Sequence, residues 1–231
     1  MKNIIFLFGF VMIISGCTIN KAITYPTADI PINPDKSLKN IILSVEDFTD
    51  GRKEHEHNLI LFNNKRDCEI DEKRLCINAE RHYKTEPVAK QLSIRLLHHF
   101  KKRFSFKKVV ANTVDKSTID YYITGKVSSF YGVQEFSMTA KAGTYFGLIG
   151  VLATMNIHTP GKIIVEITDL KIYDKHGQVV KDMGTFSRHY EGDFLVDAEC
   201  FKIYEHINAK LKEYYTELTE LIENELKLIV N

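Results

Sequence analysis

Few residues in this chain are arranged as catalytic or metal-binding groups usually are. His55 and His57 flank Glu56, so the two imidazoles would share one face of a strand but not one face of a helix. The zinc motif His-Glu-x-x-His instead places two histidines on the same face of a helix. We therefore interpret these three residues as part of a solvated loop.

The other reactive groups are equally incomplete. Asp47, Asp50 and Glu54 could pair as carboxylates near the end of a strand, but acidic residues are common at such positions. His98 and His99 are adjacent on a predicted helix and point in different directions, so we expect one of them to face solvent. Because the sequence also lacks a Gly-x-Ser-x-Gly elbow and a Walker loop, we predict no enzymatic activity, no cofactor and no metal.

The cysteines outside the amino-terminal signal fall into two settings. Cys68 and Cys76 lie close together in a polar stretch, where a disulfide between them would close one surface loop of the chain. Cys200 lies where the last predicted helix begins and shares its apolar side, so we interpret it as a buried free thiol. No Cys-x-x-Cys pair occurs, so neither a zinc knuckle nor a thioredoxin-like redox site is expected.

The amino terminus has the features of a secretion signal. A short basic start precedes an unbroken apolar run from Ile4 to Ile14, and small residues then lead to Cys17. A transmembrane helix needs about 20 apolar residues, and this run is shorter. We therefore predict that residues 1–16 are a signal peptide that is removed.

The stretch Ile13-Ile14-Ser15-Gly16-Cys17 resembles the bacterial lipobox. This resemblance implies that Cys17 becomes the first residue of the mature protein and carries several acyl chains, palmitate among them. Stable anchoring takes more than one acyl chain, which such a cysteine would supply. It also implies a lipoprotein of the cell envelope, which we expect on the outer membrane facing the periplasm. An ordinary secretory signal cut nearby would leave Cys17 as a plain thiol.

The charge balance argues against one class of partner. The 231 residues include 31 lysines and arginines against 30 aspartates and glutamates, a net charge of +1. The net charge is therefore too small to attract nucleic acid or to draw the protein onto an anionic surface. Membrane attachment must come from the lipid on Cys17 and from local patches.

Behind the signal, the chain divides into a linker and one domain. Residues 17–39 are rich in proline and have little apolar periodicity, so we predict a flexible tether that carries the lipid. Residues 40–231 are enough for a single domain with a sizeable core. Two inserts interrupt this domain: a polar one over about 52–85 and an apolar, glycine-rich one over about 142–160.

Periodicity predicts strands, one hairpin and two helices in this domain. In chain order they are a strand over 40–48, a helix over 85–103, strands over 106–110 and 119–131, a hairpin over 162–190 and a helix over 197–229. We expect a bulge or a bend at Gly125, a bulge near Thr168 or Asp169, and a turn at Asp50-Gly51. This order predicts an α+β fold, in which a mostly antiparallel sheet carries both helices on one face as a two-layer sandwich.

Three stretches resemble landmarks of small envelope lipoproteins: Val45 to Arg52, Asp120 to Val127, and Leu170 to Gly177. They are similar to stretches of lipoproteins related to YajG and of the amino-terminal domain of TolB, and the curli secretion lipoprotein CsgG has a related core. The resemblance spans residues 40 to 228. It implies a non-enzymatic α/β fold in the envelope and assigns no catalytic residue.

The segment from Ala142 to His158 contains no lysine, arginine, aspartate or glutamate and is rich in glycine. It is too short to span a bilayer as a helix. Three interpretations are open: a buried part of the core, a surface for self-association or a partner, and a loop that dips into the membrane. A contact surface would use the large apolar side chains of the segment, namely Tyr145, Phe146, Leu148, Ile149 and Leu152.

Two functions from different classes fit these features. The first is a membrane-anchored accessory or assembly component that acts through contacts with envelope proteins or with its own copies. The second is a periplasmic module that binds or carries a lipid or another apolar ligand between helix and sheet. The uncharged segment fits either function.

Overall fold

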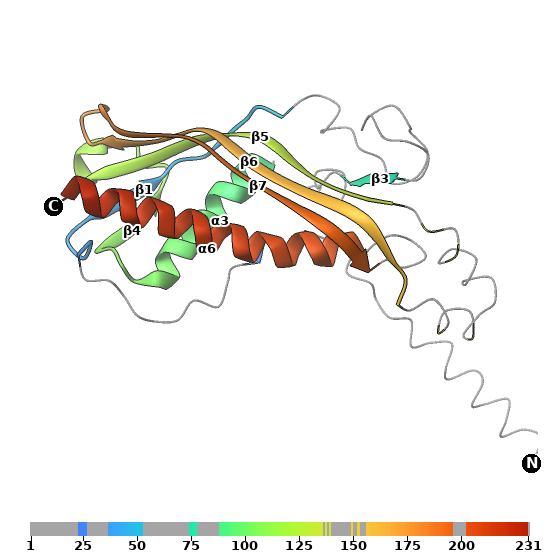
Figure 1. The fold of residues 1–231 in the computed structure, drawn as a ribbon. Helices are drawn as coiled ribbons and strands as arrows, with labels where there is room; N and C mark the ends of the chain where they lie inside the picture. Colours follow the sequence, from blue (N-terminus) through green and yellow to red (C-terminus); the bar gives the residue numbers. More distant parts are fainter. Residues whose placement is uncertain are drawn as a thin grey trace, which may run out of the picture.

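The structure is a computed structural model, and it describes residues 23–26, 37–52, 74–77, 88–135, 137, 139, 149, 152, 156–195 and 202–230. In these ranges the chain forms a curved sheet with two helices against one side (Figure 1). None of the helices in the same ranges is both long enough and apolar enough to cross a bilayer.

Seven strands of the described chain form one sheet. Its central path runs β4-β1-β5-β6-β7, and the short strands β2 and β3 also pair with β5. The strands are β1 (Ile42–Val45), β2 (Thr49–Asp50), β3 (Arg74–Ile77), β4 (Lys108–Ala111), β5 (Tyr121–Glu135), β6 (His158–Asp174) and β7 (Val179–Leu195).

The sheet is mixed, with parallel pairs at one end and antiparallel pairs at the other. β1 runs parallel to β4 on one side and to β5 on the other. Helix α3 (Val88–Arg103) lies between β1 and β4 in the chain, and a helical crossover is the usual way to join parallel neighbours. After β4 the chain returns through the 3-10 helix η1 (Lys116–Thr118), so β5 starts beside β1 and runs in the same direction.

The expectation of a mostly antiparallel sheet is therefore wrong. The strand positions were close to those predicted, but the direction of β1 and β4 depends on the crossover through α3. The structure also has no turn at Asp50-Gly51, where one was expected. Asp50 belongs to β2, and the Gly51 N–H donates to the Val127 carbonyl at 2.8 Å, so the chain there extends the sheet.

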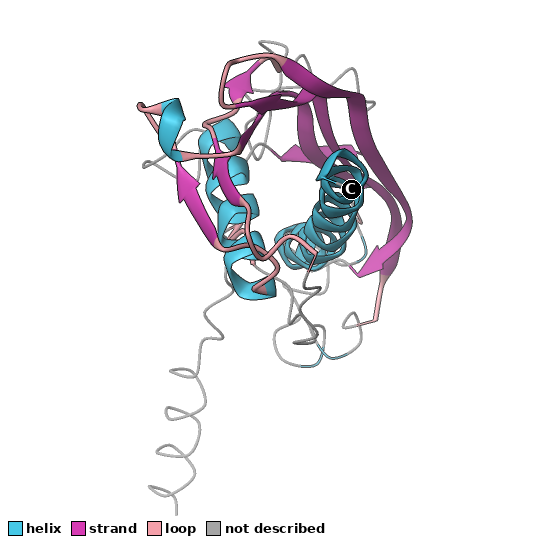
Figure 2. Ribbon diagram, turned by 90° about the vertical axis from the view of Figure 1, so that its left-hand side faces the viewer, coloured by secondary structure: helices cyan, strands magenta, loops and turns pink. Residues whose placement is uncertain are grey.

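Strands β5, β6 and β7 form a long antiparallel meander. β6 and β7 have 17 residues each, and the turn between them contains Gly177 at a φ of 81°. Both predicted bulges are confirmed: the β5–β6 register shifts around Gly125, and the β6–β7 register shifts between Ile167 and Leu170, where Asp169 has a φ of 50°. Bulges bend and twist strands, and the meander curves around the helices (Figure 2).

Both helices lie inside the concave side of the sheet (Figure 2). α6 (Lys202–Val230) runs along the meander, and α3 lies between α6 and the β1–β4 end of the sheet. Each helix buries one apolar face, and burial of apolar area contributes roughly 25 cal/mol per Å². The buried positions step by three and four, through Leu92, Leu96 and Phe100 on α3 and Ile203, Ile207, Leu211, Tyr214, Leu218 and Ile222 on α6. The periodicity of the last helix predicted Leu221 on this face, which is wrong, because Leu221 is 37% exposed and Ile222 is buried instead.

The amino-terminal segment takes part in this core. Ile23 and Tyr25 are 1% and 3% exposed. The Thr24 N–H between them donates to Asn208 Oδ1 on α6 at 2.8 Å. The flexible tether predicted over 17–39 is therefore wrong for these residues, because two isolated apolar side chains in a proline-rich stretch show no periodicity that would indicate docking.

Candidate functional site

Most of the site residues predicted from the sequence lie outside the described residues. These are Cys17, Cys68, Tyr145, Phe146 and Leu148, together with His55, Glu56, His57, Glu54 and Cys200. For Cys76 the structure gives the backbone, which lies in β3. Lipidation and the disulfide therefore stay predictions.

Two members of the predicted contact surface are described, and both are exposed. Ile149 is 80% exposed and Leu152 is 59% exposed. Both have helical backbone. For these two residues, such exposure agrees with a contact surface or a membrane-dipping loop and disagrees with a buried core segment.

Asp50, one of the carboxylates predicted near the end of β1, is bound by an arginine. Asp50 accepts from Arg52 Nε at 3.0 Å and from Arg52 Nη2 at 2.6 Å, and the Arg52 side chain is buried. The Asp47 N–H donates to Asn112 Oδ1 at 2.7 Å, which fixes the chain after β1. Within the described ranges, no group of His, Cys, Asp and Glu side chains is suited to hold a metal ion.

A polar contact is buried between α3 and α6. His98 is exposed and His99 is buried, as expected for the pair. Thr219 Oγ1 lies 2.6 Å from the Tyr215 carbonyl and donates to it, so His99 Nδ1–H is the donor in the 3.1 Å contact with Thr219 Oγ1. His99 Nε2 has no hydrogen-bond partner in the described chain. Burial, with a smaller effect of the nearby Arg103 charge, lowers the His99 pKa to about 4, so the ring is neutral at neutral pH.

An ion pair lies beside this contact. Arg103 Nε is 3.0 Å from both carboxylate oxygens of Glu223, which is only 2% exposed. Arg103 Nη1 also lies 3.7 Å from Glu220 Oε1. Charge-assisted pairs of this geometry are strong, and each partner neutralises the other. Both polar contacts join α3 to α6, and we interpret them as structural.

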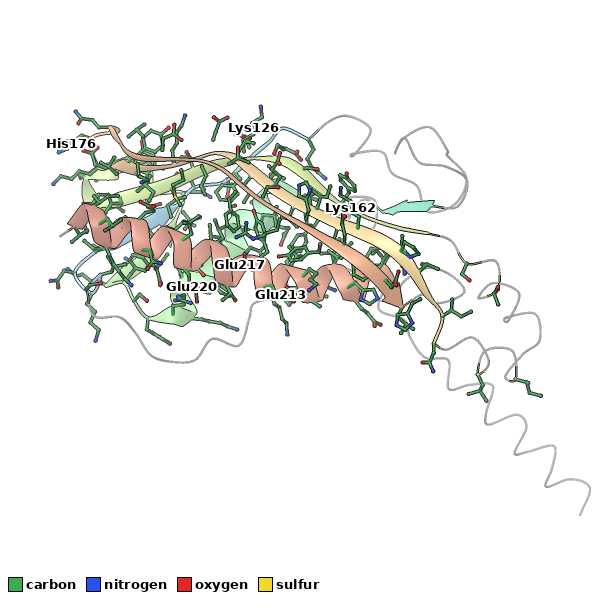
Figure 3. All side chains as sticks on the ribbon, in the orientation of Figure 1. Lys126, Lys162, His176, Glu213, Glu217 and Glu220 are labelled. Atoms are coloured by element: carbon green, nitrogen blue, oxygen red, sulfur yellow. The ribbon has the colours of Figure 1, made fainter. Side chains whose placement is uncertain are left out.

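On its other side, α6 is attached to the edge strand β7. The contacts are the ion pairs Arg188–Glu217 and Lys181–Glu225, the latter at 2.7 Å, and the Tyr214 hydroxyl, which lies 3.4 Å from the Phe186 carbonyl. Figure 3 shows Glu213, Glu217 and Glu220 in succession along α6. An open edge strand is a template for unwanted pairing, and these side chains protect part of it.

A shallow groove opens where the amino-terminal segment meets α6. It has a volume of about 580 Å³ and is lined by Thr24, Pro26, Glu205, Asn208, Ala209, Lys212 and Glu213. Two carboxylates and one ammonium group at an open surface do not select one class of ligand. We assign no chemistry to this groove.

The polar contacts between the helices were not predicted from the sequence. The signal that could have found them is a polar residue on the buried face of a helix, since such a residue needs a partner. His99 lies beside the apolar stripe of α3, and Thr219 and Glu223 are four positions apart on the buried side of α6.

No protein-family model and no curated protein matches this chain. Among solved structures, it is similar to protein XCC0632 from Xanthomonas campestris, a DUF330 protein, with 12% identity, coverage of 85% of this chain and 95% of that chain, and a TM-score of 0.41. It is also similar to the PelC dodecamer from Paraburkholderia phytofirmans, with 7% identity, coverage of 78% and 92%, and a TM-score of 0.31. A third is a protein from Helicobacter pylori described as a homolog of neuraminyllactose-binding hemagglutinin, with 9% identity, coverage of 88% and 99%, and a TM-score of 0.29.

Similarity at this level transfers neither a family nor a function to this chain. The lipobox and the likeness to YajG-related lipoproteins stay predictions from the sequence.

Proposed function

We propose that this protein is a lipid-anchored component of the bacterial cell envelope, held on the outer membrane through Cys17 and facing the periplasm. It acts without catalysis, as an accessory or assembly component that contacts envelope proteins or its own copies. The observation that best supports a contact function is the exposure of Ile149 and Leu152.

The contact lies in the uncharged segment between β5 and β6. Large apolar side chains that a fold leaves in water gain free energy when a partner covers them, at roughly 25 cal/mol per Å² of apolar area. Ile149 and Leu152 belong to a segment that has no lysine, arginine, aspartate or glutamate between Ala142 and His158. A protein surface of this composition favours association.

A carrier of lipid or of another apolar ligand would need an apolar cavity between helix and sheet. In the described chain, large side chains fill that space. Phe130 from β5 and Tyr204, Tyr214 and Leu218 from α6 are at most 1% exposed. A ligand would have to displace them, so a contact function is the better supported proposal.

The lack of catalysis is supported by the partners of the described candidate groups. Asp50 is bound to Arg52, and His99 is bound to Thr219. Each polar group serves the fold, as buried polar groups usually do.

The test compares the lipidated parent with Ile149→Asp/Leu152→Asp. A matched control, Val114→Asp/Val179→Asp, adds the same charge at two exposed valines outside the contact segment. Val114 is 97% exposed and Val179 is 50% exposed. Native mass spectrometry after gentle extraction should find the parent bound to protein, either its own copies or a partner. The contact variant should lose this association, and the control should keep it, with all three melting at the same temperature.

Two results would contradict the proposal. Co-purifying lipid without protein would favour the carrier. A large drop in the melting temperature of the contact variant alone would place these side chains in the core.

A further inference from the structure

A basic surface with an exposed aromatic side chain lies at the corner where α3 ends and β4 begins. Lys101, Lys102, Lys107 and Lys108 are all exposed there. Phe104 lies between them and is 62% exposed. We call these five residues the basic corner.

The backbone at Phe104 is in an unusual conformation for a bulky residue. Its φ of 54° lies in the left-handed region, at a position after a helix where glycine is preferred. The neighbouring Phe106 is 8% exposed and packs edge-on against Phe100 with ring centroids 5.5 Å apart. Phe104 gains no such burial, so the stability of the fold explains neither its strained backbone nor its apolar side chain.

Three of the four lysines of the basic corner are not neutralised by the fold. Lys101, Lys107 and Lys108 form no ion pair with any residue that the structure describes. The carboxylates on the adjacent turns of α6, Glu220 and Glu223, both pair with Arg103. The corner therefore presents a local cluster of lysines on a chain whose net charge is only +1.

We propose that the basic corner binds the surface of a membrane that contains anionic lipid. Lysines close to an anionic bilayer are attracted to its head groups, and an exposed aromatic ring inserts at the boundary between head groups and acyl chains. The combination of an unburied Phe104 with Lys101, Lys107 and Lys108 fits this surface better than an acidic protein, which would need no inserted ring.

The predicted anchor would keep the basic corner within reach of the bilayer. Thr24, which is bound to Asn208, lies seven positions after Cys17, and an extended chain of this length spans at most about 25 Å. Asn208 and Glu223, the partner of Arg103, are fifteen residues apart on α6, or about 22 Å. Anchor and corner could thus contact one membrane together.

The test uses a chain that begins at Thr18, so its result does not depend on lipidation of Cys17 or on the proposed contact function. This chain keeps every residue of the core, which extends from Ile23 to Leu226. It should sediment with vesicles that mix phosphatidylcholine and phosphatidylglycerol, and not with phosphatidylcholine vesicles. Salt should release it, because salt screens surface charges.

Two variants test the two components of the corner. Lys101→Gln/Lys107→Gln/Lys108→Gln should lower the partition coefficient by on the order of a hundredfold, at about fivefold for each lysine. Phe104→Gly should weaken binding several-fold and at the same time raise the melting temperature, because glycine adopts this φ without strain. If Phe104 served only the fold, Phe104→Gly would not weaken binding while it raises the melting temperature.

The matched control is Lys126→Gln/Lys175→Gln/Lys212→Gln, which removes the same charge from three other exposed lysines. The control should bind anionic vesicles like the parent. The proposal is overturned if the parent does not prefer anionic vesicles, if the control loses as much binding as the lysine variant, or if Phe104→Gly binds unchanged.

Discussion

His99 Nδ1 lies 3.1 Å from Thr219 Oγ1, across the contact between α3 and α6. Because Thr219 donates its proton to the Tyr215 carbonyl, His99 fits here as a neutral ring with its proton on Nδ1. The position of α3 against α6 therefore depends on the protonation of one buried imidazole.

The free energy of unfolding should fall as the pH drops through this titration. The His99 pKa is lowered from about 6.5 to about 4 in the folded chain, so the unfolded state binds the proton more readily. The stabilisation is complete above pH 6.5 and is lost as the pH falls towards 4. Its upper limit is about 3 kcal/mol, at roughly 1.4 kcal/mol for each pKa unit.

Urea unfolding at pH 7 and pH 4.5 measures this effect. His99→Gln should show a smaller loss between the two pH values than the parent. His98→Gln, on the exposed side of the same helix, should keep most of the loss. If both variants lose the same amount as the parent, His99 is not the group responsible.

Arg103→Met should destabilise the protein more than an ordinary surface substitution. Glu223 would stay buried, at 2% exposure, without its partner, and loss of one partner of a buried pair costs on the order of 3 kcal/mol. The control, Lys210→Met, breaks the exposed pair with Glu213 and should cost less than about 1 kcal/mol. Equal shifts of the urea midpoint for the two variants would contradict the structural role of Arg103.

Cys17→Ala should abolish stable retention in the membrane. The described chain contains no helix that could span a bilayer, and binding through lysines alone is removed by salt. Fractionation followed by a high-salt wash should release the variant and leave the parent in the pellet. Cys200→Ala serves as the control, and retention of the Cys17 variant after the wash would show that the anchor is assigned wrongly.

Cys68 and Cys76 should be linked in protein taken from its native compartment. The closed loop is small, and chain entropy gives such a bridge about 2 to 3 kcal/mol. Peptide mapping without reduction should find the two cysteines in one linked pair. Two free thiols would eliminate the disulfide.

Long periodic elements could be predicted from the sequence because their pattern is local. The steps of three and four on α6 depend only on neighbouring residues, and so do the bulges at Gly125 and Asp169. The direction of short strands is different. Leu43 pairs with Tyr121 and Ile42 pairs with Lys108. A local sequence pattern does not indicate which residues will pair when they are so far apart in the chain.

The same limit applied to the candidate site. The different environments of His98 and His99 followed from helix geometry. The partner of His99 lies 120 positions away, so the contact with Thr219 was not visible in either helix alone. Ile23 and Tyr25 dock without any periodic pattern around them, which is why the segment resembled a linker.

The contact between Thr24 and Asn208 also fixes an order of events during synthesis. The two residues are 184 positions apart, so the ribosome releases Thr24 early and Asn208 close to the end. The amino-terminal segment can reach its place only after nearly the whole chain has been made. Docking of Ile23 and Tyr25 is therefore a late step of folding.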